Sequence, residues 1–246
     1  MTEQKIRRSI RKYSERPVSD ALLNQLLEEA ERTQTMGNLQ LYSVVVTRSE
    51  EKKAELAPAH FNQPMVKQAP VVLTFCADYN RTTEWALYRK GHPGYDNFLS
   101  YQNAVTDALL YCQRFCDLAE ANGLGLCFLG TTVYQPQQII EVLHLPRLVM
   151  PVATITLGWP NENPEVSERL PLSAIRHDEV YEPVTAETID RDYEAKEKFP
   201  TNIEFVKLNK TETLAQIFTD IRYTANDCKV MSEGLLQTLK KQGFLD

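Results

Sequence analysis

The sequence predicts a fold that mixes strands and helices, of either the α/β or the α+β class, with helices packed on a sheet. Runs rich in β-branched residues at 40–48 and 69–78 are typical of buried strands. Elsewhere, apolar residues recur at steps of three and four, which is typical of helices. Because the two patterns alternate only loosely, they leave both classes open.

The first expected helix covers residues 20–32, where four leucines and an alanine form one face. Either Ser19 or Asp20 offers a side chain that suits its N-cap. The other short elements follow in chain order: a helical stretch at 50–59, a strand and turn at 125–134, a short helix at 135–143 and a strand at 149–159.

The longest helical pattern spans residues 96–122 and is apolar over most of its circumference. Such a helix is buried centrally or lies at a subunit interface. A polar, proline-punctuated loop follows at 160–171, then an acidic excursion at 175–205 and a last helix at 215–241. We expect residues 1–246 to form a single domain with this excursion.

The composition excludes several classes of protein. A net charge of −6 argues against a nucleic-acid partner, since phosphate backbones favour basic surfaces. The apolar runs are far shorter than a membrane span. Five scattered cysteines do not make a disulfide framework, and residues 1–5 show no apolar signal segment. We therefore expect a cytoplasmic protein with no membrane partner.

A dense basic cluster lies near the start of the chain, at Arg7, Arg8, Ser9 and Arg11. Arginine presents a planar fork of donors that matches phosphate, and serine adds one more hydrogen bond. The alternative is that these arginines are simply solvated. If they bind a ligand, one small phosphate ester fits this acidic chain better than a polymer does.

The usual catalytic and cofactor motifs are missing. The nine glycines spell neither G-x-G-x-x-G nor a P-loop, and no G-x-S-x-G elbow is present. The four histidines lack metal-ligand spacing, so we expect no metal site. A chain with a phosphate cluster but no nucleophile fits a protein that delegates its chemistry to a bound cofactor.

Together these segments resemble a known family. RRSIRKY and PVSDALLNQLLEEAERTQTMGNLQLYSVVV resemble the opening of the FMN-dependent nitroreductase superfamily. FNQPMVKQAPVVLTFCADYNR, NGLGLCFLGTT, PVATITLGWPNENPEVSERLP and LLQTLKKQGF resemble its NADPH-dependent nitroreductase and flavin reductase P subgroup. The resemblance covers nearly the whole chain. It implies an α+β fold with a mixed sheet flanked by helices, and an intertwined homodimer with FMN at the subunit interface.

The resemblance also implies the residues that bind the cofactor. Arg7, Arg8, Ser9 and Arg11 match the segment that binds the flavin phosphate and ribityl chain, and Arg169 matches a further phosphate ligand. Near the isoalloxazine ring, the matching positions are Thr35, Gln63, Phe128, Leu129, Gly130 and Thr131. One position departs from the subgroup: Ser167 stands where lysine is usual, with Glu168 beside it. Weaker FMN binding is the expected result.

The implied reaction transfers hydride from NADPH through flavin N5 to a small oxidised acceptor, such as a nitroaromatic, a quinone or free flavin. The two half-reactions would alternate at one site in a ping-pong mechanism, with no catalytic side chain. NADH stays open as the donor, because Lys196, Lys198, Lys207 and Lys210 replace the subgroup's arginine-rich loop. Two alternatives remain: another flavin reaction on the same fold, or a non-catalytic flavin-binding dimer.

Overall fold

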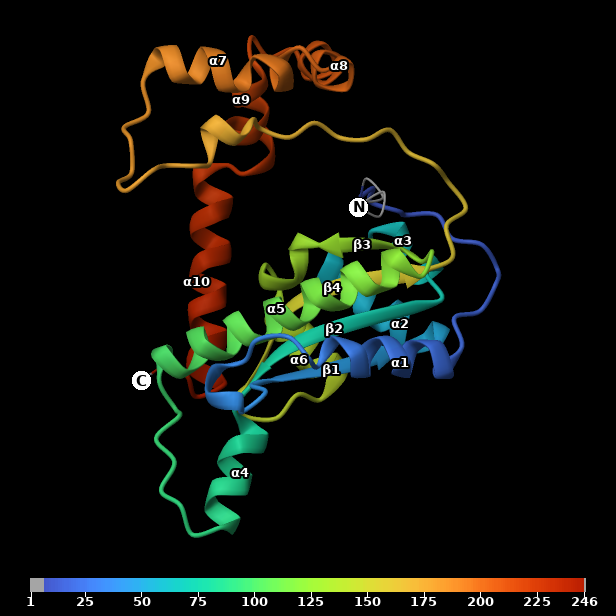
Figure 1. The fold of residues 1–246 in the computed structure, drawn as a ribbon, viewed down its shortest axis with the longest axis vertical. Helices are drawn as coiled ribbons and strands as arrows, with labels where there is room; N and C mark the ends of the chain where they lie inside the picture. The colour runs from blue at the N-terminus through green and yellow to red at the C-terminus, as the bar shows by residue number, and fades with distance from the viewer. Residues whose placement is uncertain (1–6, 246) are drawn as a thin grey trace. The chain divides into compact units, whose positions relative to one another are not determined.

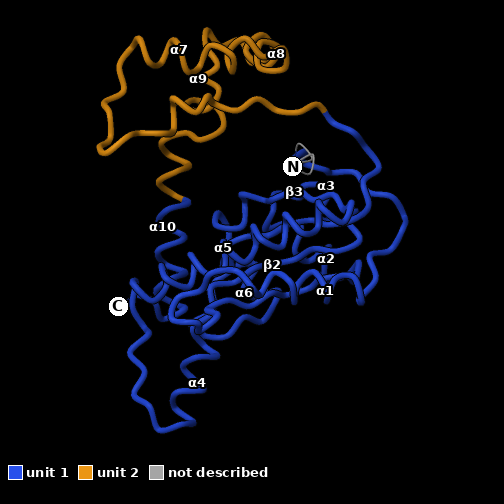
Figure 2. The backbone as a smooth tube through the Cα atoms, viewed as in Figure 1, with its two compact units in different colours: residues 1–164, 231–246 blue, residues 165–230 orange. Residues whose placement is uncertain are grey.

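A computed structural model describes residues 7–245 (Figure 1). The argument about a signal segment rested on residues 1–5, which lie outside that range. The chain divides into two compact units, Met1–Pro164 with Met231–Asp246, and Glu165–Val230 (Figure 2). No helix in the described range is long and apolar enough to cross a membrane.

The first unit is built on a four-stranded sheet. Its strands are β1 (Tyr42–Thr47), β2 (Val71–Asp78), β3 (Gly125–Leu129) and β4 (Val149–Gly158), in the order β1-β2-β4-β3. All three ladders are antiparallel. In the described chain, the parallel component of the expected mixed sheet is one bridge, between Ser9 and Leu126. Helices and an antiparallel sheet together confirm the α+β class.

Helices cover this sheet, namely α1 (Asp20–Ala30), α2 (Glu50–Leu56), α3 (Pro64–Gln68), α5 (Phe98–Ala121), α6 (Pro136–Leu143) and the end of α10 (Ala225–Lys241). Helix α4 (Asn80–Tyr88) projects away from the sheet (Figure 1). The Ser19 side chain caps α1 by accepting a hydrogen bond from the Leu22 amide. The stretch expected at 50–59 divides into α2 and a 3₁₀ turn, Ala57–His60. Helices α3 and α4 were not expected.

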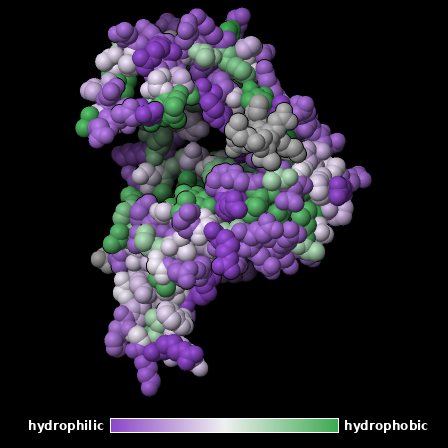
Figure 3. Space-filling view, viewed as in Figure 1, coloured by the Kyte–Doolittle hydropathy of each residue, from purple (hydrophilic) through white to green (hydrophobic). Residues whose placement is uncertain are grey.

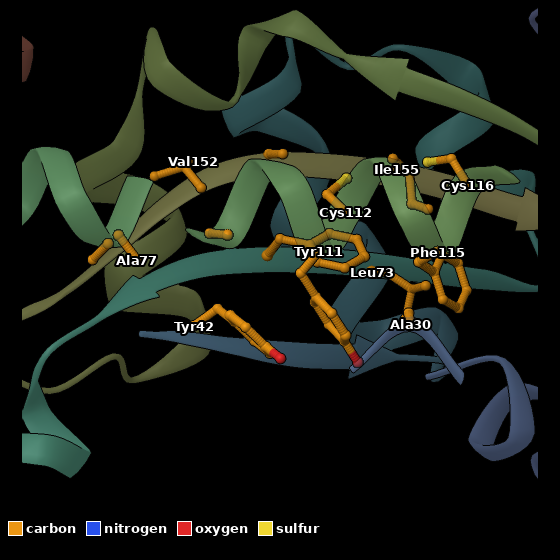
Figure 4. Close-up of a cluster of buried hydrophobic side chains, with 14 of the residues drawn as sticks. Ala30, Tyr42, Leu73, Ala77, Tyr111, Cys112, Phe115, Cys116, Val152 and Ile155 are labelled. Atoms are coloured by element: carbon orange, nitrogen blue, oxygen red, sulfur yellow. The ribbon is translucent and has the colours of Figure 1, made fainter. Parts of the chain in front are cut away.

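Helix α5 is the long helix expected at 96–122, and one of its faces is buried on the sheet. Tyr111 stacks on Tyr42 of β1, with ring centroids 4.2 Å apart. Phe115 packs against Phe75 of β2, with ring centroids 5.9 Å apart. Figure 4 shows Tyr111 and Phe115 of α5 and Tyr42 of β1 in this core. These aromatic contacts hold α5 on the sheet, and they thereby fix the position of the side chains on its opposite face.

The second unit is mainly helical. It holds α7 (Ala186–Glu197), α8 (Pro200–Asn209), α9 (Leu214–Gln216), a π-helical stretch (Ile217–Arg222) and the start of α10. The excursion at 175–205 was expected to be extended, yet α7 and much of α8 lie within it. The continuous helix expected at 215–241 is wrong, because the chain leaves helical geometry at Tyr223.

Candidate functional site

The arginine-rich segment lies along β3. The Ile10 amide donates to the Leu126 carbonyl at 2.9 Å, and Ser9 bridges to the same residue. A β-carbon on Gly125 would stand only 2.7–2.9 Å from Ile10 side-chain atoms. Glycine at this position therefore lets the segment approach the start of β3, which brings Arg7, Arg8 and Ser9 there.

Tyr13 anchors the same segment to the sheet. Its hydroxyl donates to the Ile10 carbonyl at 2.7 Å and lies 2.6 Å from Oγ1 of Thr156 on β4. Burial, the largest influence, raises the pKa of Tyr13, so the phenol stays protonated. Further along, the Arg16 guanidinium lies 3.6 Å above the Trp159 ring. The basic segment is thus fixed at two points.

Glu162 also holds the backbone of the segment. Its carboxylate accepts hydrogen bonds from the amides of Arg11 and Lys12, the second at 3.0 Å. The sequence analysis did not single out Glu162. It lies about 150 residues from its partners, so local patterns carry no signal for this contact.

A hollow of about 260 Å³ lies beside this segment, lined by Arg7, Arg8, Ile10, Glu120, Gly123, Leu124, Gly125, Pro160, Glu162 and Asn163. Nε of Arg7 is 3.8 Å from the Glu120 carboxylate. Burial raises the pKa of Glu120, and Arg7 opposes this rise. Nε of Arg8 is buried and has no hydrogen-bond partner in the described chain. An unsatisfied buried donor in a hollow suits an acceptor-rich group such as a phosphate.

A second polar group lies past the end of β3. There the 3₁₀ turn Gly130–Val133 meets the chain around Gln63. Nε2 of Gln63 donates to Oγ1 of Thr131 at 3.4 Å, and Nδ1 of His60 lies 2.9 Å from the same oxygen. Phe61 and Asn62, just before Gln63, both have φ of 53°, in the left-handed region that non-glycine residues rarely adopt. Such strain is common at ligand sites. The structure therefore brings Gln63 and Thr131 together.

The remaining residues of this turn differ in exposure. Phe128 is 45% exposed and Leu129 only 2%. The Leu129 side chain belongs to the core beneath α2 and α6, so only its backbone is available to a ligand. Gly130 has open space where a β-carbon would stand. Burial raises the pKa of the Cys127 thiol, while the nearby Arg11 and Arg7 charges oppose the rise, which places the Arg11 charge near β3.

Thr35 is held by a carboxylate that the sequence analysis missed. Its hydroxyl donates to Asp107 of α5, which also accepts from the amides of Met36, at 2.8 Å, and Leu41, at 3.2 Å. Asp107 is only 1% exposed. Of the three aspartates at 96–122, Asp107 lies three residues after Ala104 and four before Tyr111, at the helical spacing of the apolar face, which was an available signal for such a role. Because the Thr35 proton is already donated, this hydroxyl can offer a ligand only a lone pair.

Ser167 and Arg169 belong to the second unit. The Arg169 guanidinium donates to Oγ of Ser167 at 3.0 Å and to the Glu168 carbonyl at 2.8 Å. Lys196 pairs with the Glu168 carboxylate at 2.9 Å and, as the largest influence, lowers its pKa. The anion beside Ser167 is therefore already neutralised within its own unit. A role of Ser167 and Arg169 at the flavin phosphate stays a prediction.

Comparison with known proteins decides the family. A family model described as the nitroreductase family matches residues 5–159, well over half of the chain. The chain belongs to the nitroreductase family. The resemblance seen in its motifs is thereby confirmed.

Relatives of this chain include enzymes with named activities. The FMN reductase [NAD(P)H] of Bacillus subtilis strain 168 is 32% identical over 181 residues, 71% of either chain. The oxygen-insensitive NADPH nitroreductase of Salmonella typhimurium is 30% identical and covers 75% of either chain. A crystal structure from Bacteroides fragilis NCTC 9343 matches with a TM-score of 0.97 and 55% identity, over 98% of each chain.

Proposed function

We propose that this protein is an FMN-dependent oxidoreductase that transfers hydride from NADPH to a small oxidised acceptor, such as a nitroaromatic, a quinone or a flavin. The printed activities of the Bacillus and Salmonella relatives support this assignment. The observation that carries it is the arrangement along β3. Arginines and a hollow lie at its start, and the Gln63–Thr131 pair lies past its end. This suits an elongated ligand with a phosphate at one end and a polar ring at the other.

The buried, unpartnered Nε of Arg8 supports a phosphate at this place, because a phosphate oxygen would supply the acceptor that this donor lacks. Arg7, Arg8, Ser9 and Arg11 would hold it, with Ser167 and Arg169 as further candidates. Gln63, Thr131 and the backbone of 128–130 would bind the ring edge, and Thr35 would accept a hydrogen bond. When bound, FMN supplies hydride transfer at its N5 atom. The protein's own groups bind and orient it, and the guanidinium groups stabilise negative charge on it.

NADPH is the favoured donor, and NADH remains an alternative. Lys196 pairs with Glu168, and Lys198 pairs with Glu194. No ion pair is found for Lys207 or Lys210 within residues 7–245, so these two ammonium groups are the better candidates for the 2′-phosphate of NADPH. Steady-state kinetics with both donors, in the wild type and in Lys207→Ala, would compare them.

A homodimer is part of the proposal. Helix α5 and the end of β3 leave large apolar side chains exposed, namely Phe98 (51%), Leu99 (69%), Leu109 (40%), Leu110 (41%) and Phe128 (45%). Figure 3 shows hydrophobic surface gathered over the part of the first unit where α5 and β3 lie in Figure 1. Exposed apolar surface of this kind marks an interface. Sedimentation should give the mass of a dimer, and a monomer at micromolar concentration would contradict this part of the proposal.

The five cysteines are all free thiols. Cytoplasmic location and the description of 1–246 as one domain remain proposals from the sequence. Fractionation of cells and limited proteolysis would test them.

The deciding experiment is the visible spectrum of the purified protein before and after anaerobic NADPH. Flavin bands that bleach support both cofactor and donor. Bands that persist with either nicotinamide favour another flavin reaction or a non-catalytic flavin-binding dimer. A protein that shows no flavin bands after incubation with FMN contradicts the proposal.

A further inference from the structure

His60 is a buried histidine that the proposed binding role does not use. It ends the 3₁₀ turn Ala57–His60 and is 0% exposed. Ala57 and Ala59 of the same turn belong to an apolar core with Leu56 of α2 and Ile139 of α6. Burial alone lowers the pKa of His60 to about 4, so the ring is neutral at physiological pH. A neutral imidazole carries one proton, on either Nδ1 or Nε2.

The two nitrogens have different surroundings. Nδ1 lies 2.9 Å from Oγ1 of Thr131, whereas Nε2 is buried with no partner in the described chain. A proton on Nε2 would leave a buried N–H donor unsatisfied. A proton on Nδ1 provides the donor for the contact with Thr131, and it leaves only the lone pair of Nε2 without a partner. Buried N–H groups are rarely left orphaned, so the Nδ1–H form is favoured.

This form fixes the direction of the hydrogen bonds at Thr131. The hydroxyl oxygen then accepts one hydrogen bond from His60 and one from Nε2 of Gln63. With both lone pairs used, the Thr131 proton must be donated away from these two residues. The Gln63 amide likewise has its nitrogen engaged, which leaves its carbonyl oxygen for another partner. Thr131 and Gln63 are both only partly buried, so a ligand can reach them.

We propose that His60 is a positioning residue which, as the Nδ1–H tautomer, orients Thr131 as a donor and Gln63 as an acceptor toward the pyrimidine edge of the flavin. The inference rests on the proposed function. That edge carries carbonyl acceptors and one imide N–H donor, which this pair of groups complements. His60 contacts no ligand itself and acts only through Thr131.

A double-mutant cycle with FMN affinity as readout tests the coupling. His60→Leu and Thr131→Val should each raise the FMN dissociation constant about tenfold, the effect of one lost hydrogen bond. The double variant should be no worse than either single variant, because both remove the same interaction. Effects that multiply would mean that His60 acts only on packing, and they would overturn the inference.

His60→Asn is the matched control, since its amide nitrogen can replace Nδ1–H. It should restore FMN affinity and the flavin reduction potential to near the wild-type values. In His60→Leu the potential should fall, because a donor to a flavin carbonyl favours the reduced form. An unchanged potential in His60→Leu would also overturn the inference.

A measurement on the wild type avoids dependence on the variants' folding. Protein labelled with ¹⁵N-histidine should show His60 as the Nδ1–H tautomer, and an Nε2–H tautomer would overturn the inference whatever the variants do. Failure of the proposed function can be told apart from failure of this inference. Wild-type protein that binds no FMN refutes both the proposed function and the role of His60. Normal FMN binding by the wild type, with effects of the two substitutions on the dissociation constant that multiply, refutes only the role of His60.

Discussion

The hydroxyl of Tyr13 lies 2.6 Å from the hydroxyl of Thr156, 143 residues further along the chain, and also donates to the Ile10 carbonyl. This contact ties the arginine-rich segment to β4. Tyr13→Phe should lower the free energy of unfolding by about 1–3 kcal/mol, because buried polar partners lose their hydrogen bond. It should also weaken FMN binding. Denaturant unfolding and flavin titration measure the two effects, and Tyr88→Phe, at an 80% exposed position, is the control.

Gly125→Ala tests whether the segment must lie close to β3. The added β-carbon would collide with Ile10, so we expect a loss of about 1–3 kcal/mol in unfolding free energy and weaker FMN binding. Gly234→Ala on α10 is the matched control. Its β-carbon meets nothing within 4 Å, and alanine should stabilise the helix by about 0.5–1 kcal/mol. Equal melting temperatures for the two variants would contradict the close approach.

Arg8→Met separates stability from ligand binding. Removing an unpaired buried donor should leave the flavin-free protein as stable as the wild type or more so. The same change should weaken FMN binding by tenfold or more, as roughly 1.5–3 kcal/mol of charged hydrogen bonding is lost. Thermal melts with and without FMN provide both numbers. A variant destabilised without FMN would show that Nε of Arg8 has an internal partner.

Arg11→Ala should weaken FMN retention without unfolding the protein. Arg11 is exposed and lies beside β3, so its loss removes charge but little packing. We expect the FMN dissociation constant to rise about tenfold. Arg89→Ala, which removes an exposed arginine just past α4, should leave FMN occupancy unchanged. Unchanged flavin content in purified Arg11→Ala would rule out its assignment.

Acid should destabilise the protein through His60. Its pKa falls from an ordinary 6.5 to about 4 in the folded state, so between these values only the unfolded chain takes up the proton. The stabilisation is complete above pH 6.5 and is lost as the pH falls toward 4. Between pH 7 and pH 5 the loss should be about 2 kcal/mol. Urea unfolding at pH 7 and pH 5 should show this loss of unfolding free energy in the wild type and not in His60→Leu. An equal change in unfolding free energy between the two pH values in both proteins would contradict the prediction.

The sequence predicted the elements that bury apolar faces. The β-branched runs became β1 and β2, and the apolar pattern at 96–122 became α5, within two residues at the N-terminus and one at the C-terminus. Helix α4 was missed because Thr82 is its only buried residue, so it carries no apolar period. Helices α7 and α8 were missed for the same reason. Asp192 is the only buried residue of α7, and α8 has no buried residue.

Local motifs predicted candidate site residues, but they did not predict the distant residues that contact them. Gln63 and Thr131 were identified in separate motifs, and the structure brings them together. His60, Asp107 and Glu162 were not assigned to the site. Each contacts its partner across 66 to 151 residues, and a single sequence holds no record of such pairings.

The Asp107 carboxylate has a consequence for how the chain folds. It completes the turn that begins at Thr35, across 66 to 72 residues of intervening sequence. During synthesis, the amides of Met36 and Leu41 can donate only to water until α5 has emerged and brought Asp107 to them. Contacts that close so long a loop form late. We therefore expect the turn at Thr35 to form only after α5 has docked on the sheet.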